Sequence, residues 1–209
     1  MHAKADGEFI DTPLDADLLS TPFKIQTKWH VITGAPCSGK TTLVDLLADK
    51  GFRINMEAGR RFFERELAKG RTIDEIRQDP AAITCEIYDM MVNHERVLPP
   101  EELIFLDRAL PDAFTFFRVA DMNPNGILLD CFEYRYTSVF MLERLPYERD
   151  GVRDADDQIA AYHESWMLRD YSALGYDVIR VPVLPPVERL AFVLESLSAR
   201  YGIQIDHRE

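Results

Sequence analysis

The chain has 209 residues, 46% of them hydrophobic and 29% charged, which is typical of a globular protein with one core. Its formal net charge of −12 excludes functions that need a broad basic surface, so we expect no nucleic-acid partner. The three cysteines are odd in number and lack metal-ligand spacing, which favours a reducing compartment over a disulfide framework.

The N-terminal residues differ from the rest of the chain. Residues 1–24 are polar, acidic and interrupted by proline, and we interpret them as a flexible tail with at most a short helical turn at residues 15–19. They carry no basic-then-apolar targeting signal, and no apolar run in the chain reaches membrane-spanning length. We therefore expect a cytoplasmic protein without integral membrane association, with one domain over residues 25–209.

Strand and helix patterns alternate along this domain. Short apolar segments predict five strands, at residues 29–33, 52–56, 103–106, 138–142 and 177–181. Apolar spacing predicts helices at residues 41–48, 58–69, 80–97, 125–134, 157–173 and 186–200, with one more beginning at Pro111. Thr72 and Glu75 match a capping box. The alternation predicts an α/β three-layer fold whose parallel sheet binds ligands at the carboxyl ends of its strands.

The turn after the first predicted strand carries the most specific pattern. Residues 34–41 match G-x-x-x-x-G-K-[ST] at every fixed position, between a strand and a helix as a phosphate-binding loop requires. Its glycines let backbone amides surround phosphate oxygens, and the helix N-terminus attracts anions. The alternative is a chance glycine-rich turn, but such a turn would not need a strand directly before it and a helix directly after it. We predict that the nucleotide contacts Gly34, Ala35, Pro36, Cys37, Ser38, Gly39, Lys40, Thr41 and Thr42.

Two of these side chains have a predicted chemical role. Lys40 is expected to reach the β- and γ-phosphates, and the Thr41 hydroxyl is expected to bind Mg²⁺. Asp107 ends a predicted apolar strand, where a carboxylate holds Mg²⁺ directly or through water, or orients an acceptor hydroxyl. The alternative is that Asp107 only caps the following turn. Arg108 is expected to pair with a phosphate or a carboxylate.

A further carboxylate follows the second predicted strand. Small-molecule kinases often use a carboxylate at the position of Glu57 to accept the proton of the acceptor hydroxyl, although Glu57 could equally be a first-turn helix residue. Arg60 or Arg61 is expected to neutralise it. Asp112 either points into the acceptor pocket or lies in the first helical turn behind Pro111.

The predicted acceptor region comprises the helices of residues 58–134. The charged residues 143–157 resemble a lid, and we expect Arg149 and Arg153 to close over the γ-phosphate, with a merely solvated loop as the alternative.

These motifs resemble the AAA_28 group of P-loop proteins, which includes the ribosylnicotinamide kinase domain. The stretches that carry the resemblance are Thr33 to Thr42, Glu57 to Arg61, Phe105 to Arg108 with Asp112, and Val181 with Pro182. The resemblance implies the fold of P-loop nucleoside and nucleotide kinases, with sheet order 2-3-1-4-5, and the use of ATP with Mg²⁺. Taken together, the patterns described above predict a catalytic set comprising Lys40, Asp107, Glu57, Arg108, Arg149 and Arg153, with Thr41 and Asp107 as metal ligands.

The sequence therefore predicts a kinase that transfers the γ-phosphoryl group of ATP to a hydroxyl of a nucleoside-like or other small metabolite. The alternative is a nucleotide-dependent switch or regulatory NTPase that acts on a protein or lipid partner. An N-K-x-D guanine-reading motif is absent, which disfavours a Ras-like GTPase but leaves GTP open as the nucleotide. Either Glu57 or Asp107 could be the base.

Overall fold

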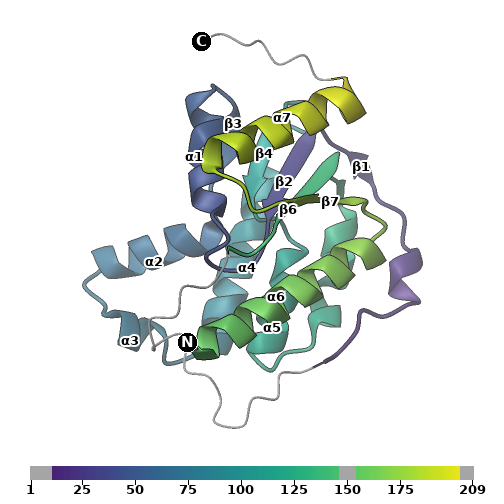
Figure 1. The fold of residues 1–209 in the computed structure, drawn as a ribbon. Coiled ribbons are helices and arrows are strands. Elements are labelled where there is room, and N and C mark those ends of the chain that lie inside the picture. Colours follow the sequence, from purple (N-terminus) through teal and green to yellow (C-terminus); the bar gives the residue numbers. More distant parts are fainter. Residues whose placement is uncertain (1–10, 146–153, 203–209) are drawn as a thin grey trace.

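The computed structural model describes residues 11–145 and 154–202, except the side chains of residues 154–157. A parallel sheet lies at the centre and helices cover both of its faces (Figure 1). Its strands, in the order in which they pair across the sheet, are β3 (Arg53–Asn55), β4 (Ile104–Asp107), β2 (Trp29–Thr33), β6 (Ser138–Leu142) and β7 (Val178–Val181). Counted along the chain within this sheet, the order is 2-3-1-4-5, so the predicted α/β fold and strand order are confirmed.

The two faces of the sheet are covered by different helices. Leucine and valine side chains of α1 (Lys40–Asp49) and α7 (Pro186–Tyr201) pack on one face, against β2, β4, β6 and β7. The other face is covered by α4 (Pro80–Arg96), α5 (Asp112–Val119) and α6 (Asp154–Ala173). Among the described residues, no helix combines the length and apolarity needed to cross a membrane.

Between the two main helical layers, α2 (Ala58–Ala68) and the short α3 (Ile73–Ile76) extend from the end of β3 to α4 (Figure 1). The predicted capping box is present, because the Thr72 hydroxyl accepts from the Glu75 amide and the Glu75 carboxylate accepts from the Thr72 amide. It fixes the start of α3, and Asp79 caps α4 in turn through the amide of Ala82.

Two elements differ from the sequence prediction. The helix predicted at residues 125–134 is a 3₁₀ helix, η2 (Pro124–Phe132), whose first turn is capped by the Asn123 side chain. A second sheet joins β1 (Ile25–Gln26) to β5 (Tyr134–Arg135) in parallel. Each of its strands has two residues, too few to show a sequence period.

The segment before β1 also differs from the expected tail. Residues 11–24 lie along the domain and include the 3₁₀ turn η1 (Leu18–Ser20). Leu14 is buried and Phe23 packs against the same core, while the carbonyl oxygen of Thr12 accepts a hydrogen bond from a buried arginine. Residues 11–24 are therefore packed in part against the domain, because Leu14 is buried and Leu18, Leu19 and Phe23 are partly buried against its core. The flexibility of residues 1–24 stays a prediction.

That arginine, Arg118, belongs to a buried ion pair between α5 and α6. Its Nη1 and Nη2 donate to the two carboxylate oxygens of Asp170 at 2.6 and 2.8 Å, and its guanidinium lies 3.9 Å from the Trp166 ring centroid. Both charged side chains are almost fully buried. Burial removes both groups from water at a cost in free energy, and their ion pair offsets this cost. Removing either partner would therefore leave the other charge buried and uncompensated.

Replacing Arg118 with Met is expected to lower the free energy of unfolding by about 3–5 kcal/mol, because Asp170 stays buried without its partner. The matched control is Arg200→Met, since Arg200 pairs with Asp177 at 2.7 Å on the surface, and we expect a loss below about 1 kcal/mol there. Urea denaturation followed by circular dichroism measures both. Equal losses in the two variants would contradict the structural role given to the buried pair.

A second buried carboxyl group lies on α4. The two oxygens of Glu95 accept hydrogen bonds from the Tyr136 hydroxyl at 3.1 and 2.9 Å, and Oε1 also accepts from the Leu110 amide at 3.2 Å. Burial outweighs these bonds and raises the pKa of Glu95 to about 8. Glu95 therefore keeps its proton near neutral pH.

Because the unfolded chain releases this proton at lower pH, rising pH between about 5 and 8 destabilises the folded state, with a slope of at most about 1.4 kcal/mol per pH unit. We expect Glu95→Gln to flatten this part of the stability profile, since the single amide oxygen still accepts from the Tyr136 hydroxyl and the Leu110 amide and the side chain has no titratable proton. Unfolding titrations of the two proteins at several pH values provide the test. The difference between the two curves should be constant below about pH 4.5 and change from pH 5 to 8, and parallel curves from pH 5 to 8 would contradict the raised pKa.

Candidate nucleotide and acceptor site

The turn from β2 to α1 has the backbone of a phosphate-binding loop. Gly34 and Gly39 have φ of 141° and 88°, which favour glycine, and Cys37 adopts φ of 60° between them. A Cβ atom on Gly34 would lie 2.8 Å from the carbonyl oxygen of Leu142 on β6. Glycine at this position therefore lets the loop lie directly against the neighbouring strand.

Lys40 lies over this loop. Its Nζ donates to the carbonyl oxygens of Gly34 and Ala35 at 3.1 and 2.9 Å, and the side chain is buried. Burial first, and then the positive charge of Arg108, lower the pKa of Lys40 to about 7. Among the described residues, the hydrogen-bond partners of its ammonium group are neutral carbonyl oxygens, and an anion bound in the loop would supply a countercharge.

Two buried oxygen atoms near the loop, Ser38 Oγ and Asp107 Oδ1, have no hydrogen-bond partner within the described part of the chain. Thr41, the second residue of α1, is half-buried beside them. Burial, followed by the charge of Glu57, raises the pKa of Asp107 to about 6. Hydroxyl and carboxylate oxygens are the ligands that Mg²⁺ prefers, so Thr41 and Asp107 fit the predicted metal-binding role.

Arg108 connects the ends of two strands. Its Nε donates to Glu57 Oε1 at 2.8 Å and its Nη1 donates to Asp112 Oδ1 at 3.0 Å. Burial would raise the pKa of Glu57, but the attraction and hydrogen bond of Arg108 outweigh it and hold that pKa below its usual value. Arg108 is therefore the main positive partner of Glu57, and the charge of Arg60 adds a smaller attraction. Arg61 contacts His94 instead.

The backbone at Arg108 has φ of 70°, a left-handed conformation that an arginine rarely adopts. Its amide still donates to the carbonyl oxygen of Ile32 at 3.1 Å, so the turn begins directly at the sheet. Strain of this kind persists only where the surroundings fix it, and here the two carboxylates on either side do so.

Asp112 is the first residue of α5 and does not line the acceptor cavity. Of the two predicted roles, the helical first turn is correct. The side chain is fully buried and its carboxylate accepts four hydrogen bonds, from the Thr33 hydroxyl, Arg108 Nη1, the Ala109 amide and the Tyr171 hydroxyl. Asp112 therefore positions Arg108 rather than touching a ligand.

A cavity of about 1070 Å³ opens at the carboxyl ends of β3 and β4. Glu57, Asp107 and Arg108 form one end of its wall, and residues of α2, α3, α4 and α5 form the rest. The helices of the predicted acceptor region thus enclose a space that begins at the candidate catalytic residues.

Arg189 is a residue that the sequence analysis missed. It lies on α7, and its guanidinium donates to the carbonyl oxygens of Ser38 at 2.5 Å, Pro182 at 3.0 Å and Glu143 at 3.1 Å. These acceptors belong to the phosphate-binding loop, the turn after β7 and the residue after β6. Because Arg189 stands 151 residues from Ser38, no local pattern could indicate the contact.

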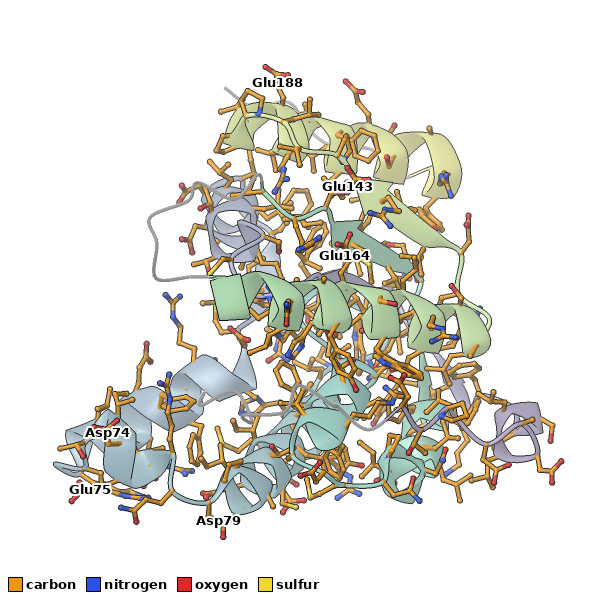
Figure 2. All side chains as sticks on the ribbon, turned by 60° about the horizontal axis from the view of Figure 1, so that its bottom comes forward. Asp74, Glu75, Asp79, Glu143, Glu164 and Glu188 are labelled. Atoms are coloured by element: carbon orange, nitrogen blue, oxygen red, sulfur yellow. The ribbon has the colours of Figure 1, made fainter. Side chains whose placement is uncertain are left out.

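Of the predicted lid, only its two ends fall within the described residues, so Arg149 and Arg153 lie outside them. At the near end, Arg144 Nε donates to Glu164 Oε2 at 2.9 Å. Arg180 on β7 donates to both Glu143 and Glu164, and Figure 2 shows these two carboxylates between α6 and the strand end. The chain leaving β6 is therefore anchored to α6 and β7.

We expect Arg189→Met to weaken nucleotide binding about tenfold, because it leaves the carbonyl oxygens that hold the loop without their donor. Arg189→Lys should recover part of the loss. Glu188→Gln is the matched control, since Glu188 is an exposed neighbour at the start of α7 (Figure 2). Titration with a fluorescent nucleotide measures affinity. Unchanged affinity in Arg189→Met would contradict this role for Arg189.

Comparisons with known proteins identify the same architecture. Two structures of the NadR protein, one with NR and one with NAD and AMP-PNP, match with TM-scores of 0.61 and 0.58 at 15% and 18% identity. Each match covers 88% of this chain but only 53% and 52% of the NadR chains, so the protein spans about half their length.

Two further structures match over nearly their whole length. Thymidylate kinase from Ehrlichia chaffeensis matches with a TM-score of 0.55 at 14% identity, over 85% of this chain and 100% of that one. Deoxyadenosine kinase from M. mycoides matches with a TM-score of 0.54 at 12% identity, over 82% and 98%. At such identities these similarities establish the fold.

No curated protein sequence matches the chain. The model of the AAA_28 family, described as an AAA domain, matches residues 29–189. This region begins at β2 and extends to Arg189, and it includes the phosphate-binding loop and the ion network around Arg108. The protein therefore belongs to the AAA_28 family and has the fold of P-loop kinases.

Proposed function

We propose that the protein is a cytoplasmic kinase that transfers the γ-phosphoryl group of ATP to a hydroxyl group of a small molecule. The observation that carries the proposal is that a candidate nucleotide site and a candidate acceptor cavity lie side by side. The phosphate-binding loop with Lys40 lies next to Glu57 and Asp107, and these two carboxylates form one end of a cavity large enough for a second substrate. A kinase needs both sites side by side, whereas a nucleotide switch needs only the first.

The loop would hold the nucleotide through its backbone amides, with Lys40 at the β- and γ-phosphates. Thr41 and Asp107 would hold Mg²⁺, which neutralises charge on the phosphate oxygens. GTP would fit the same loop, since backbone amides do not distinguish the bases. Arg149 and Arg153 complete the proposed set by offsetting charge on the transferred group.

In the proposed step, the hydroxyl oxygen of the acceptor forms a bond to the γ-phosphorus. The bond from that phosphorus to the bridging oxygen of ADP breaks, and ADP leaves with the electron pair. Glu57 accepts the hydrogen bond of the hydroxyl and takes its proton, while Arg108 holds the carboxylate in a fixed orientation at 2.8 Å. Asp107 is then left free to hold the metal.

The three cysteines support the proposed location. Cys37, Cys85 and Cys131 are unpaired, as proteins of a reducing compartment usually are.

Lys40→Ala is expected to weaken ATP binding by roughly two orders of magnitude, because the only lysine of the loop is lost while the fold remains. Acceptor-dependent ADP release should disappear with it. Calorimetric titration with ATP and Mg²⁺ measures the affinity, and a coupled assay measures ADP. Unchanged ATP affinity in this variant would refute the proposed nucleotide site.

Glu57→Gln serves as the companion variant that separates a kinase from a switch. In a kinase it should reduce acceptor-dependent turnover at least about tenfold and leave ATP affinity within about twofold of the original protein. Turnover that needs no acceptor, and that Glu57→Gln does not alter, would favour the nucleotide-dependent NTPase instead.

A further inference from the structure

A group of apolar side chains forms much of the wall of the acceptor cavity. Side chains from the end of β3 and from α2, α4 and α5 stand partly exposed around it, namely Met56, Phe63, Ile83, Ile87, Met91 and Phe116. Leaving such surface in water is unfavourable, by about 25 cal/mol per Å². An occupant with a matching apolar body would remove this surface from water.

The polar groups of the wall are separated in space. Glu57, Asp107 and Arg108 lie together at the strand ends, whereas Asp74 and Arg77 belong to the α3 corner (Figure 2 shows Asp74 there). Arg60 on α2 and His94 and Glu95 on α4 are further polar members of the wall. An occupant with one polar end can place that end at Glu57 and Asp107 and its apolar body against the apolar side chains of α2, α4 and α5.

Few uncharged polar side chains are placed to read a heterocycle. In the described wall they are Asn55, Gln78, Thr84, Tyr88 and His94. Three of them already have partners, because the Thr84 hydroxyl donates to the carbonyl oxygen of Pro80 at 2.8 Å, the Tyr88 hydroxyl donates to Asp130, and His94 Nε2 lies 3.5 Å from Arg61 Nη1. A base with several donors and acceptors would leave most of its polar groups unpaired among methionine, isoleucine and phenylalanine.

The size of the cavity leaves room for an extended occupant. Its volume of about 1070 Å³ lies at the upper end of the range for pockets that enclose drug-sized ligands. Two methionines, Met56 and Met91, contribute flexible apolar surface that adapts to an extended body.

We propose that the phosphoryl acceptor is an alcohol with an extended hydrocarbon body. This inference rests on the proposed kinase function. The hydroxyl lies at Glu57 and Asp107, and the hydrocarbon body lies between α2 and α4, against Phe63 and Ile87. The reaction balances as alcohol and ATP giving an alkyl phosphate, ADP and one proton, which Glu57 first receives.

The test begins with binding in the absence of nucleotide, so that it does not depend on catalysis. Geraniol and 1-decanol, kept below their aggregation concentrations, and adenosine are titrated into the full chain by calorimetry. We expect micromolar binding of the two alcohols with a negative heat-capacity change, and at least tenfold weaker binding of adenosine. Adenosine binding as tight as that of the alcohols would overturn the inference.

Variants locate the bound alcohol. Ile87→Asn places an amide in the middle of the apolar wall and should weaken alcohol binding roughly tenfold or more. Phe63→Ser is a second, independent change on α2. The control is Leu67→Gln, because Leu67 is 44% exposed on α2 and is not part of the wall. Circular dichroism verifies the fold of each variant. Equal alcohol affinity in Ile87→Asn and Leu67→Gln would overturn the assigned cavity.

Turnover then separates this inference from the function on which it rests. Lys40-dependent ADP release with geraniol or 1-decanol supports both. Lys40-dependent release with adenosine but with neither alcohol overturns the hydrocarbon acceptor and leaves the kinase proposal standing. Failure of the chain to bind ATP refutes the kinase proposal, while the alcohol titration still decides what the cavity binds.

Discussion

The ion pairs of Arg108 are the interaction on which the site depends. One guanidinium joins Glu57, at the end of β3, to Asp112, at the start of α5. It follows directly on β4, so three elements that meet at the sheet edge are held by one side chain. Asp112 in turn binds Thr33 and Tyr171, which extends the network to β2 and α6. Loss of the guanidinium would leave two carboxylates close together without a countercharge.

Burial of the residues around this network also shifts the pKa values of two neighbouring groups, Lys40 and Asp107. It lowers the pKa of Lys40 to about 7 and raises that of Asp107 to about 6, in opposite directions because burial disfavours either charged form. Within residues 11–145 and 158–202, neither side chain forms an ion pair. A phosphate with its metal ion would supply one partner for each, which explains why a binding site keeps these charges at a buried position.

Sequence patterns predicted the features that depend on neighbouring residues. The β2 strand, the glycine loop and the Thr72–Glu75 box are local, and their spacing alone indicates them. Three features could not be read in this way. Arg189 reaches the loop from the far end of the chain, the carbonyl oxygen of Thr12 accepts from Arg118 on α5, and Asp112 is held by Thr33 and Tyr171. In each case the partner is set by tertiary packing. The roles of Arg149 and Arg153 stay predictions.

The close approach of Gly34 to Leu142 has a mechanical consequence. Because a Cβ atom added at residue 34 would lie 2.8 Å from the carbonyl oxygen of Leu142, only glycine lets the loop lie this close to the end of β6. Arg189 donates hydrogen bonds both to Ser38 in the loop and to Glu143, the residue after Leu142. The loop and the end of β6 are therefore held together at two points, one by backbone packing and one by a side chain from α7.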